Sequence, residues 1–261
     1  MKLSISNIAW DMCYDEQMYF FLEQEGFLGL EIAPTRIFQI DPYEKLDEAK
    51  EFSEKLKKKY GIVISSLQSI WFGKNENLFR SEDERNELIK YTKKAINFAQ
   101  MCGCKNLVFG CPKNRNLDKL EQYSLAVEFF RELGEYAKLH ETVIAIEPNP
   151  TIYNTNFINY TNEAFKIVDD VNSSGFKVNI DLGTILYNKE DLSWIETKLD
   201  RVNHIHISEP YLEKVKINEI HESLAQQLKN KNYDKFISIE MKNNGDINSV
   251  KEILKSVKKI F

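Results

Sequence analysis

The sequence predicts an α/β fold in which the whole chain forms a single (β/α)₈ barrel. Short apolar segments alternate eight times with longer amphipathic segments along the 261 residues, and this alternation is typical of parallel strands joined by helices. No linker or low-complexity stretch divides the chain, so we expect one domain over residues 1–261. A doubly wound open sheet is the alternative, but it needs a glycine-rich turn after its first strand, and residues 7–11 contain no glycine.

The expected strands are short runs rich in isoleucine, valine and leucine, at residues 3–9, 27–33, 62–68, 106–110, 143–147, 177–181, 202–210 and 236–240. The expected helices have apolar residues at helical spacing, and they cover residues 16–25, 42–60, 81–102, 117–140, 161–171, 192–199, 217–228 and 247–259. Gly26, Gly61 and Gly103 follow three of these helices, at the position where helices commonly end. Residues 81–84 have the Ser-x-x-Glu pattern of a capping box.

Composition excludes several classes of protein. The net charge of −5 is spread along the chain without a basic block, so we expect no nucleic-acid partner. No apolar run approaches the roughly 20 residues of a membrane span, and the N-terminus lacks a signal-peptide pattern, so we expect no membrane partner. Of the four cysteines, Cys102 and Cys104 are too close together for an easy disulfide. Reduced thiols and a cytoplasmic location follow as expectations.

Four consecutive late strands end in the same pattern of side chains. They read Ile144-Ala-Ile-Glu147, Val178-Asn-Ile-Asp181, Ile205-His-Ile207 and Ile237-Ser-Ile-Glu240. Successive side chains on a strand point to opposite faces, so the branched residues can pack on the helices while the others point inward. Glu147, Asp181, His206 and Glu240 then face the barrel axis at the carboxyl ends of their strands, where active sites of this fold lie.

Three carboxylates in one small buried space repel one another unless protons or a cation compensate them. One divalent metal ion bound by Glu147, Asp181, His206 and Glu240 would do so. Mixed oxygen and nitrogen donors favour Mn²⁺, with Mg²⁺, Co²⁺ and Zn²⁺ as alternatives, and a structural zinc site would need more thiolates. Three ion pairs and a core histidine would explain each residue alone, but not four on neighbouring strands. Nothing in the sequence calls for a nucleotide cofactor.

These motifs resemble the xylose-isomerase-like barrel superfamily of sugar-phosphate isomerases and epimerases. The segments that match, in order, are Glu147-Pro-Asn, Asp181-Leu-Gly-Thr, His204-Ile-His206 and Ser-Ile-Glu240. The resemblance implies that His206 rather than His204 is the metal ligand, and that Glu147 and Glu240 also serve as catalytic acid and base. Thr184 departs from the pattern, because many relatives have a histidine there. The early-strand histidines of the DNA-repair endonuclease branch are also missing.

A metal ion between two glutamates suits proton transfer next to a carbonyl group, through an enediolate. The predicted function is therefore a divalent-metal-dependent sugar or sugar-phosphate isomerase or epimerase. The same enediolate could lose water, so a metal-dependent sugar dehydratase, a lyase, is the first alternative. A DNA-repair endonuclease and a carbohydrate-binding barrel without catalysis are weaker alternatives.

Polar residues near the strand ends are the predicted contacts of a small carbohydrate substrate. Arg115 could hold a carboxylate or phosphate through its two-pronged guanidinium group, and Lys242 has the parity to point inward two residues after Glu240. The full set of predicted substrate contacts is Glu31, Gln68, Lys113, Arg115, Asn149, Thr184, His204, Glu209 and Lys242. The oligomeric state stays open, with a homodimer as one arrangement that barrels of this kind adopt.

Overall fold

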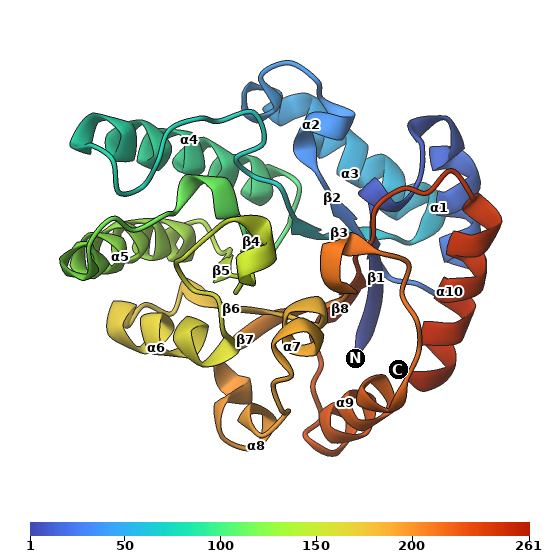
Figure 1. Cartoon of the computed structure of the whole chain (residues 1–261). Coiled ribbons are helices and arrows are strands. Elements are labelled where there is room, and N and C mark those ends of the chain that lie inside the picture. The colour runs from blue at the N-terminus through green and yellow to red at the C-terminus, as the bar shows by residue number, and fades with distance from the viewer.

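The computed structural model describes residues 1–261 and shows eight parallel strands closed into a barrel (Figure 1). The strands pair in chain order, and β8 closes the barrel by pairing with β1. They are β1 (Lys2–Ser6), β2 (Gly29–Ile32), β3 (Val63–Leu67), β4 (Leu107–Phe109), β5 (Ile144–Ile146), β6 (Phe176–Asp181), β7 (Val202–Ile207) and β8 (Phe236–Ile239). The predicted (β/α)₈ fold class is confirmed.

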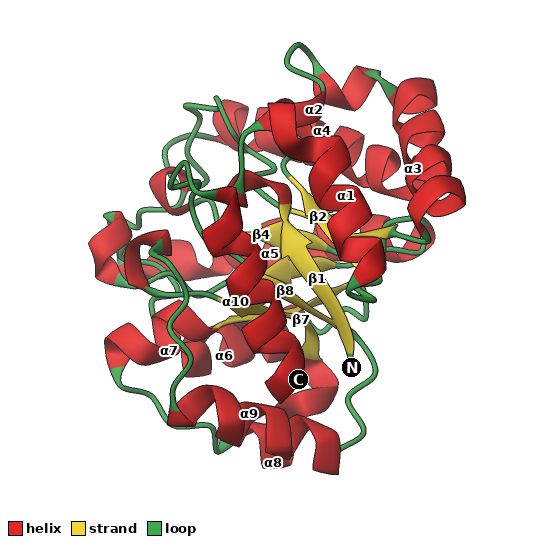
Figure 2. Ribbon diagram, turned by 90° about the vertical axis from the view of Figure 1, so that its right-hand side faces the viewer, coloured by secondary structure: helices red, strands yellow, loops and turns green.

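Helices surround the barrel in Figure 1, and the side view in Figure 2 shows α1 and α10 in front of the strands. They are α1 (Asp15–Gln24), α2 (Pro34–Ile37), α3 (Leu46–Tyr60), α4 (Glu82–Met101), α5 (Tyr123–Leu139), α6 (Thr161–Val171), α7 (Leu182–Asn188), α8 (Trp194–Lys198), α9 (Glu219–Asn230) and α10 (Ile247–Ile260). None of them combines the length and the apolar character needed to cross a membrane.

The main core lies between the barrel wall and the helices. Phe130 of α5 is fully buried there, stacked on Phe176 of β6 with ring centroids 4.7 Å apart and packed edge-on against Phe109 of β4. The interior of the barrel is different, because its inward residues are mostly small and polar. Buried serines lie on β1, β3 and β8: Ser4, Ser65, Ser66 and Ser238. Small side chains on these strands leave room for the larger polar groups of β2 and β7.

Several helices differ from the prediction: α2 was not predicted, α3 begins at Leu46 rather than at residue 42, and α5 and α7 differ for identifiable reasons. Helix α5 begins at Tyr123 rather than at residue 117, because the Gln122 side chain accepts hydrogen bonds from the backbone N–H groups of Asp118 and Lys119 and holds them outside the helix. The short helix α7 was not predicted, because Gly183 is a poor helix former. A Cβ atom there would lie 2.9 Å from the backbone of Glu209, so glycine allows α7 to approach the segment after β7.

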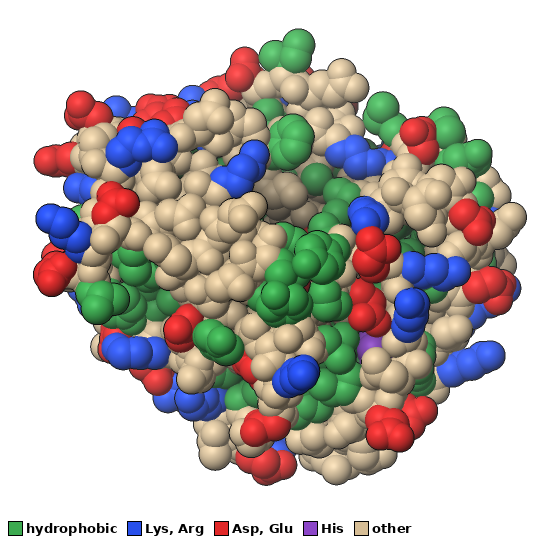
Figure 3. Space-filling model, viewed as in Figure 1, with side chains coloured by type: hydrophobic (Ala, Val, Ile, Leu, Met, Phe, Trp, Pro, Cys, Tyr) green, Lys and Arg blue, Asp and Glu red, His purple; other side chains and the backbone are tan.

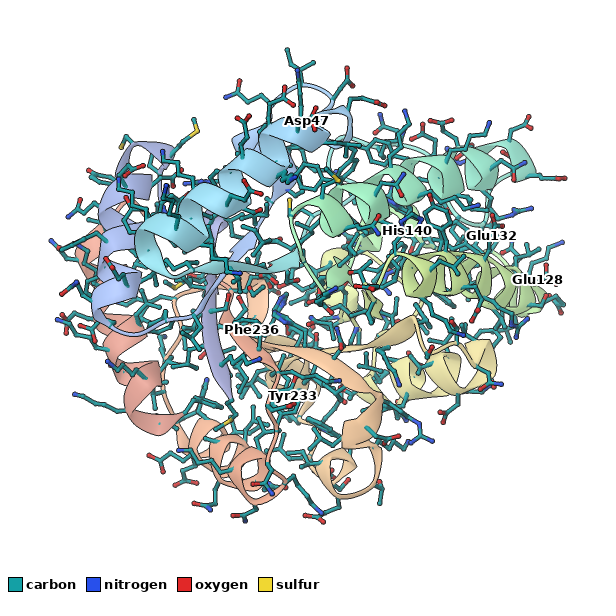
Figure 4. The ribbon with its side chains drawn as sticks, turned by 180° about the vertical axis from the view of Figure 1, so that it is seen from behind. Asp47, Glu128, Glu132, His140, Tyr233 and Phe236 are labelled. Atoms are coloured by element: carbon teal, nitrogen blue, oxygen red, sulfur yellow. The ribbon has the colours of Figure 1, made fainter.

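The two histidines outside β7, His140 and His221, lie at the end of α5 and in α9. Figure 4 views the molecule from behind and labels His140 at the end of α5 and Phe236 at the start of β8. His140 is hydrogen-bonded to Gln100 through Nδ1, 2.8 Å apart. His221 is buried in the first turn of α9, where its Nδ1 contacts the capping residue Asn218. Neither residue belongs to the cluster described below.

The packing of α5 against the barrel can be tested with two variants of that helix. We expect Phe130→Ala to lower the free energy of unfolding by about 3–5 kcal/mol, because it removes a fully buried ring and leaves a cavity. Leu139→Ala is the matched control; the leucine is 78% exposed, so we expect a change within about 0.5 kcal/mol. Urea unfolding followed by circular dichroism measures both values. Equal effects of the two variants would contradict this packing.

Candidate active site

Four potential metal ligands meet at the carboxyl ends of strands β5 to β8. Glu147 follows β5, Asp181 ends β6, His206 lies in β7 and Glu240 follows β8. One donor atom from each lies within 4.8 Å of the others, and all four side chains are buried. The register of the sheet contributes directly, since Asp181 pairs with His206 across β6 and β7. We refer to these four residues as the donor cluster.

His206 is at the centre of the donor cluster. Its Nδ1 lies 2.8 Å from Oε1 of Glu147 and 3.1 Å from Oε2 of Glu240, and its Nε2 lies 2.9 Å from Oε2 of Glu31. Asp181 is fixed separately, because its Oδ1 accepts the N–H of Thr184 at 2.6 Å and so caps α7. The strand end and the helix start that follows it therefore fix this carboxylate in place.

Two amide side chains hold the carboxylate of Glu147. Asn179 of β6 donates to Oε1 at 2.7 Å and Asn149 donates to Oε2 at 2.9 Å. Asn149 is itself oriented by Arg115, whose Nη2 donates to its Oδ1 at 2.6 Å and to the backbone carbonyl of Glu147 at 2.9 Å. The sequence prediction missed Asn179, although its inward parity on β6 was a usable signal.

The donor cluster is electrostatically strained without positive charge. Burial and, to a smaller extent, the charges of Glu147 and Glu240 together raise the pKa of Asp181 to about 7. Burial also raises the pKa of Glu240, against the opposing effect of His206. For His206 burial acts in the opposite sense, but the charges of Glu31 and Glu240 outweigh it and hold the imidazole pKa well above its usual value. Protons or a cation must therefore balance the buried carboxylates.

A cavity of about 190 Å³ opens above the donor cluster, and Figure 3 shows a hollow near the middle of this face. Glu147, Asp181 and Glu240 line one part of it. The remaining lining residues are uncharged: Ile8, Gln68, Ser69, Val108, Gly110, Cys111, Pro112, Asn149, Tyr153 and Leu212. No lysine or arginine contributes to the wall of the cavity.

Tyr153 is a further polar residue of the cavity that the sequence prediction missed. It lies in the loop after β5, in a short 3₁₀ turn over residues 151–153. Burial raises the pKa of its phenol, and the charge of Asp181 adds to the effect. The hydroxyl therefore stays protonated and can donate a hydrogen bond to a ligand. A single tyrosine in a polar loop gave no pattern from which this position could be predicted.

A family model described as xylose isomerase-like TIM barrel matches residues 21–260. The chain belongs to this family. A search of curated proteins finds no match. The resemblance that the motifs indicated is therefore confirmed at the level of the family.

Solved structures with the same xylose isomerase-like barrel include several sugar epimerases. The 3-keto-D-glucoside 4-epimerase from E. coli superposes with a TM-score of 0.80 over 99% of both chains, at 16% identity. The D-psicose 3-epimerase from Clostridium cellulolyticum H10, in complex with D-tagatose, gives 0.81 at 15% identity, covering 99% of this chain and 97% of that one. An L-ribulose 3-epimerase gives 0.76 at 13% identity, covering 100% and 92%. Identities this low show a shared fold.

The donor cluster of this xylose isomerase-like barrel fits a divalent cation. Three carboxylate groups and one imidazole converge within 4.8 Å, and such donors suit ions of the Mg²⁺, Mn²⁺, Co²⁺ and Zn²⁺ type. Burial, with the charges of neighbouring carboxylates, raises the pKa of Asp181 and of Glu240, which disfavours the ionised form of both groups. A cation would supply compensating charge, and Glu147, Asp181, His206 and Glu240 are the residues that would hold it.

The structure brings only two of the nine predicted substrate contacts to the cavity, Gln68 and Asn149. Arg115 is fully buried behind Asn149 and cannot reach a substrate anion. Lys242 points to solvent and pairs with Glu213, because β8 ends at Ile239 and the alternation that predicted an inward lysine stops there.

The other five predicted substrate contacts also lie outside the cavity wall. Lys113 is exposed on the loop after β4. The hydroxyl of Thr184 donates to the carbonyl of Pro148 at 2.8 Å, and Oε1 of Glu209 accepts the N–H of Lys216 at 3.1 Å. Glu31 and His204 have the predicted inward parity, but both are buried in the barrel interior next to His206. Lys113 is therefore directed to solvent, and Thr184 and Glu209 are directed to backbone partners.

The burial of Asp181 predicts that the free energy of unfolding of the metal-free protein depends on pH. Its pKa is about 7 in the folded chain against 3.8 without perturbation, so the folded state binds the proton more tightly and stability falls as pH rises from about 4 to above 7. At pH 8 in the presence of EDTA, we expect Asp181→Asn to raise the free energy of unfolding by about 1–3 kcal/mol, with little gain at pH 4.5.

Urea unfolding at the two pH values measures this difference. The matched control is Asp200→Asn, since that carboxylate is 75% exposed and should show no such pH dependence. Added Mn²⁺ should stabilise the wild type and not Asp181→Asn. If Asp181→Asn raised the free energy of unfolding equally at both pH values, the raised pKa of Asp181 would be contradicted.

Proposed function

We propose that this chain is a divalent-metal-dependent sugar epimerase or isomerase that works by proton transfer next to a carbonyl group. The observation that carries the proposal is the convergence of two glutamates, Glu147 and Glu240, on one donor cluster below a small cavity. The sugar epimerases of the same fold are consistent with this chemistry. Mn²⁺ is the ion we favour.

The two glutamates act as base and acid. The metal ion, when bound, polarises the substrate carbonyl and stabilises negative charge on the neighbouring oxygen. One glutamate removes the proton from the adjacent carbon, and the other returns a proton to the opposite face or to the next carbon. Return to the opposite face inverts one centre. Return to the next carbon, together with transfer of the neighbouring hydroxyl proton to the former carbonyl oxygen, moves the carbonyl. In a reversible epimerisation the two glutamates exchange roles with the direction of the reaction.

The surrounding residues orient the glutamates and the substrate. Asn149 and Asn179 hold both oxygens of Glu147, so its carboxylate keeps one orientation through the reaction. Gln68 and Tyr153 offer hydrogen-bonding groups to sugar hydroxyls from other parts of the wall. Ile8, Val108 and Leu212 provide an apolar surface for the carbon skeleton.

The cavity favours an unphosphorylated monosaccharide as substrate. Its volume of about 190 Å³ is below the roughly 300–1,000 Å³ of pockets that hold drug-sized ligands. Three acidic residues and no basic residue line it, so a phosphate group inside the cavity would be repelled rather than bound. The same features argue against abasic DNA, and the first four strands contain no histidine that could bind additional metal ions.

A cytoplasmic location is part of the proposal. All four cysteines are free thiols, and the two closest in sequence, Cys102 and Cys104, are buried. Free thiols are typical of proteins in reducing compartments.

Solvent deuterium exchange tests the proposed reaction. NMR spectra of ketoses, aldoses and their phosphates, incubated with the protein and Mn²⁺ in D₂O, should show deuterium at the carbon next to the carbonyl of an unphosphorylated sugar. We expect Glu147→Gln and Glu240→Gln each to slow this exchange by about 100- to 10,000-fold, the usual contribution of general acid–base catalysis. Glu213→Gln is the matched control, because this exposed glutamate pairs with Lys242 and does not line the cavity.

Product analysis distinguishes the alternatives. Loss of water from the sugar would show a dehydratase using the same site, and cleavage of abasic DNA would show an endonuclease. Full exchange activity in the presence of EDTA, or in Glu240→Gln, would refute the metal-dependent proton transfer.

A further inference from the structure

Behind the donor cluster, one carboxylate reaches across the barrel from β2 to β7. Oε2 of Glu31 lies 2.9 Å from Nε2 of His206 and 3.2 Å from Nε2 of His204. All three side chains are buried, with Glu31 and His206 fully inaccessible. Their positions on facing strands explain why they were not recognised as a unit from the sequence.

The two histidines do not use Glu31 in the same way. His206 Nε2 and Glu31 Oε2 have the geometry of a hydrogen bond. Nε2 of His204 approaches the same oxygen but makes no hydrogen bond. The other oxygen of Glu31 accepts only a long contact from the hydroxyl of Ser238, at 3.5 Å. The strongest interaction of the Glu31 carboxylate is therefore with His206.

We propose that Glu31 is a positioning residue for metal binding, and this inference rests on the function proposed above. By accepting the N–H at Nε2 of His206, it fixes which imidazole nitrogen carries the proton and directs the other, Nδ1, at Glu147 and Glu240. A metal ligand needs an unprotonated nitrogen, and a carboxylate behind the imidazole both selects that tautomer and makes the nitrogen more basic. His204 fills space beside Glu31 and has no such role.

Two other roles for Glu31, binding the substrate and binding a second cation, fit the structure less well. Glu31 does not line the cavity, so it cannot bind the substrate directly. A second cation held by Glu31, His204 and His206 would have to replace the hydrogen bond at Nε2 of His206. His206 would then bind one ion through each ring nitrogen, so it would have to lose both ring protons, and none would remain for Glu31 to accept.

The tautomer can be observed directly in the intact wild-type chain. Long-range ¹H–¹⁵N NMR spectra of the protein loaded with Zn²⁺, a diamagnetic ion, should show His206 bound through Nδ1 and protonated at Nε2. A spectrum with His206 bound through Nε2, or two Zn²⁺ ions per chain, would overturn the inference. This measurement does not depend on the folding of any variant.

Variants test the contribution to affinity. We expect Glu31→Gln to weaken Mn²⁺ binding by about 10- to 100-fold in calorimetric titrations, the usual effect of removing such a partner. His204→Phe keeps a ring in the same place and should change the affinity by less than about 10-fold. Thermal unfolding in EDTA verifies that both variants are folded.

The outcomes separate the two proposals. If the wild type binds no divalent ion, the metal-dependent function fails and the role of Glu31 with it. If the wild type binds Mn²⁺ and Glu31→Gln binds it equally well, only the role of Glu31 is refuted. A loss of affinity in His204→Phe as large as that in Glu31→Gln would also refute it, because the two side chains would then act through packing alone.

Discussion

The burial of three carboxylates around one imidazole is the constraint on which the rest of the site depends. Glu147, Asp181 and Glu240 are each 7% exposed, and His206 is fully buried between them. Charges this close cannot all remain ionised in a low-dielectric space without compensation. The fold supplies part of that compensation through His206 and through the amides on Glu147. The remainder has to come from protons or from a cation.

Different strands of the barrel provide the ligands of the donor cluster, the space around them and the partner of His206. Strands β5 to β8 carry the donor cluster, while β1, β3 and β8 contribute small serines that leave space in the interior. Strand β2 contributes Glu31, which faces His206 from the opposite side. Asp181 belongs at once to a strand end and to the N-cap of α7. The donor cluster is thus built into the hydrogen-bonded framework, and a change in one of these strands would disturb several of its contacts.

The convergence of Glu147, Asp181, His206 and Glu240 could be predicted from the sequence because strand parity is a strong rule. Glu147, Asp181 and Glu240 each end an alternating run, so their direction followed from the pleat alone. The rule failed where the strand had ended, as at Lys242, which pairs with Glu213 in solvent. Loops follow no such period, and the position of Arg115 behind Asn149 depends on how the loops after β4 and β5 pack together.

Strand parity predicts whether a side chain points into the barrel, but not how deep it lies or which side chain it contacts. Glu31 and His204 were correctly expected to point inward, yet both lie beside His206 in the interior and outside the cavity wall. Which inward residues meet across a barrel depends on the stagger of its strands, and the register between β2 and β3 and between β6 and β7 shifts by one residue. A single sequence carries little information on such shifts. The missed Asn179 lies next to the shift in β6, and it is hydrogen-bonded to Glu147.

The same charge constraint extends from the protein to its ligand. A cavity whose charged residues are all acidic can bind a cation and a neutral polyhydroxylated molecule together, since the cation offsets the carboxylates and the hydroxyls need only hydrogen bonds. An anionic ligand would compete with the carboxylates for that cation without any lysine or arginine to stabilise it. Selection against phosphorylated sugars would then follow from the buried charge that makes the metal site necessary, without a separate specificity element.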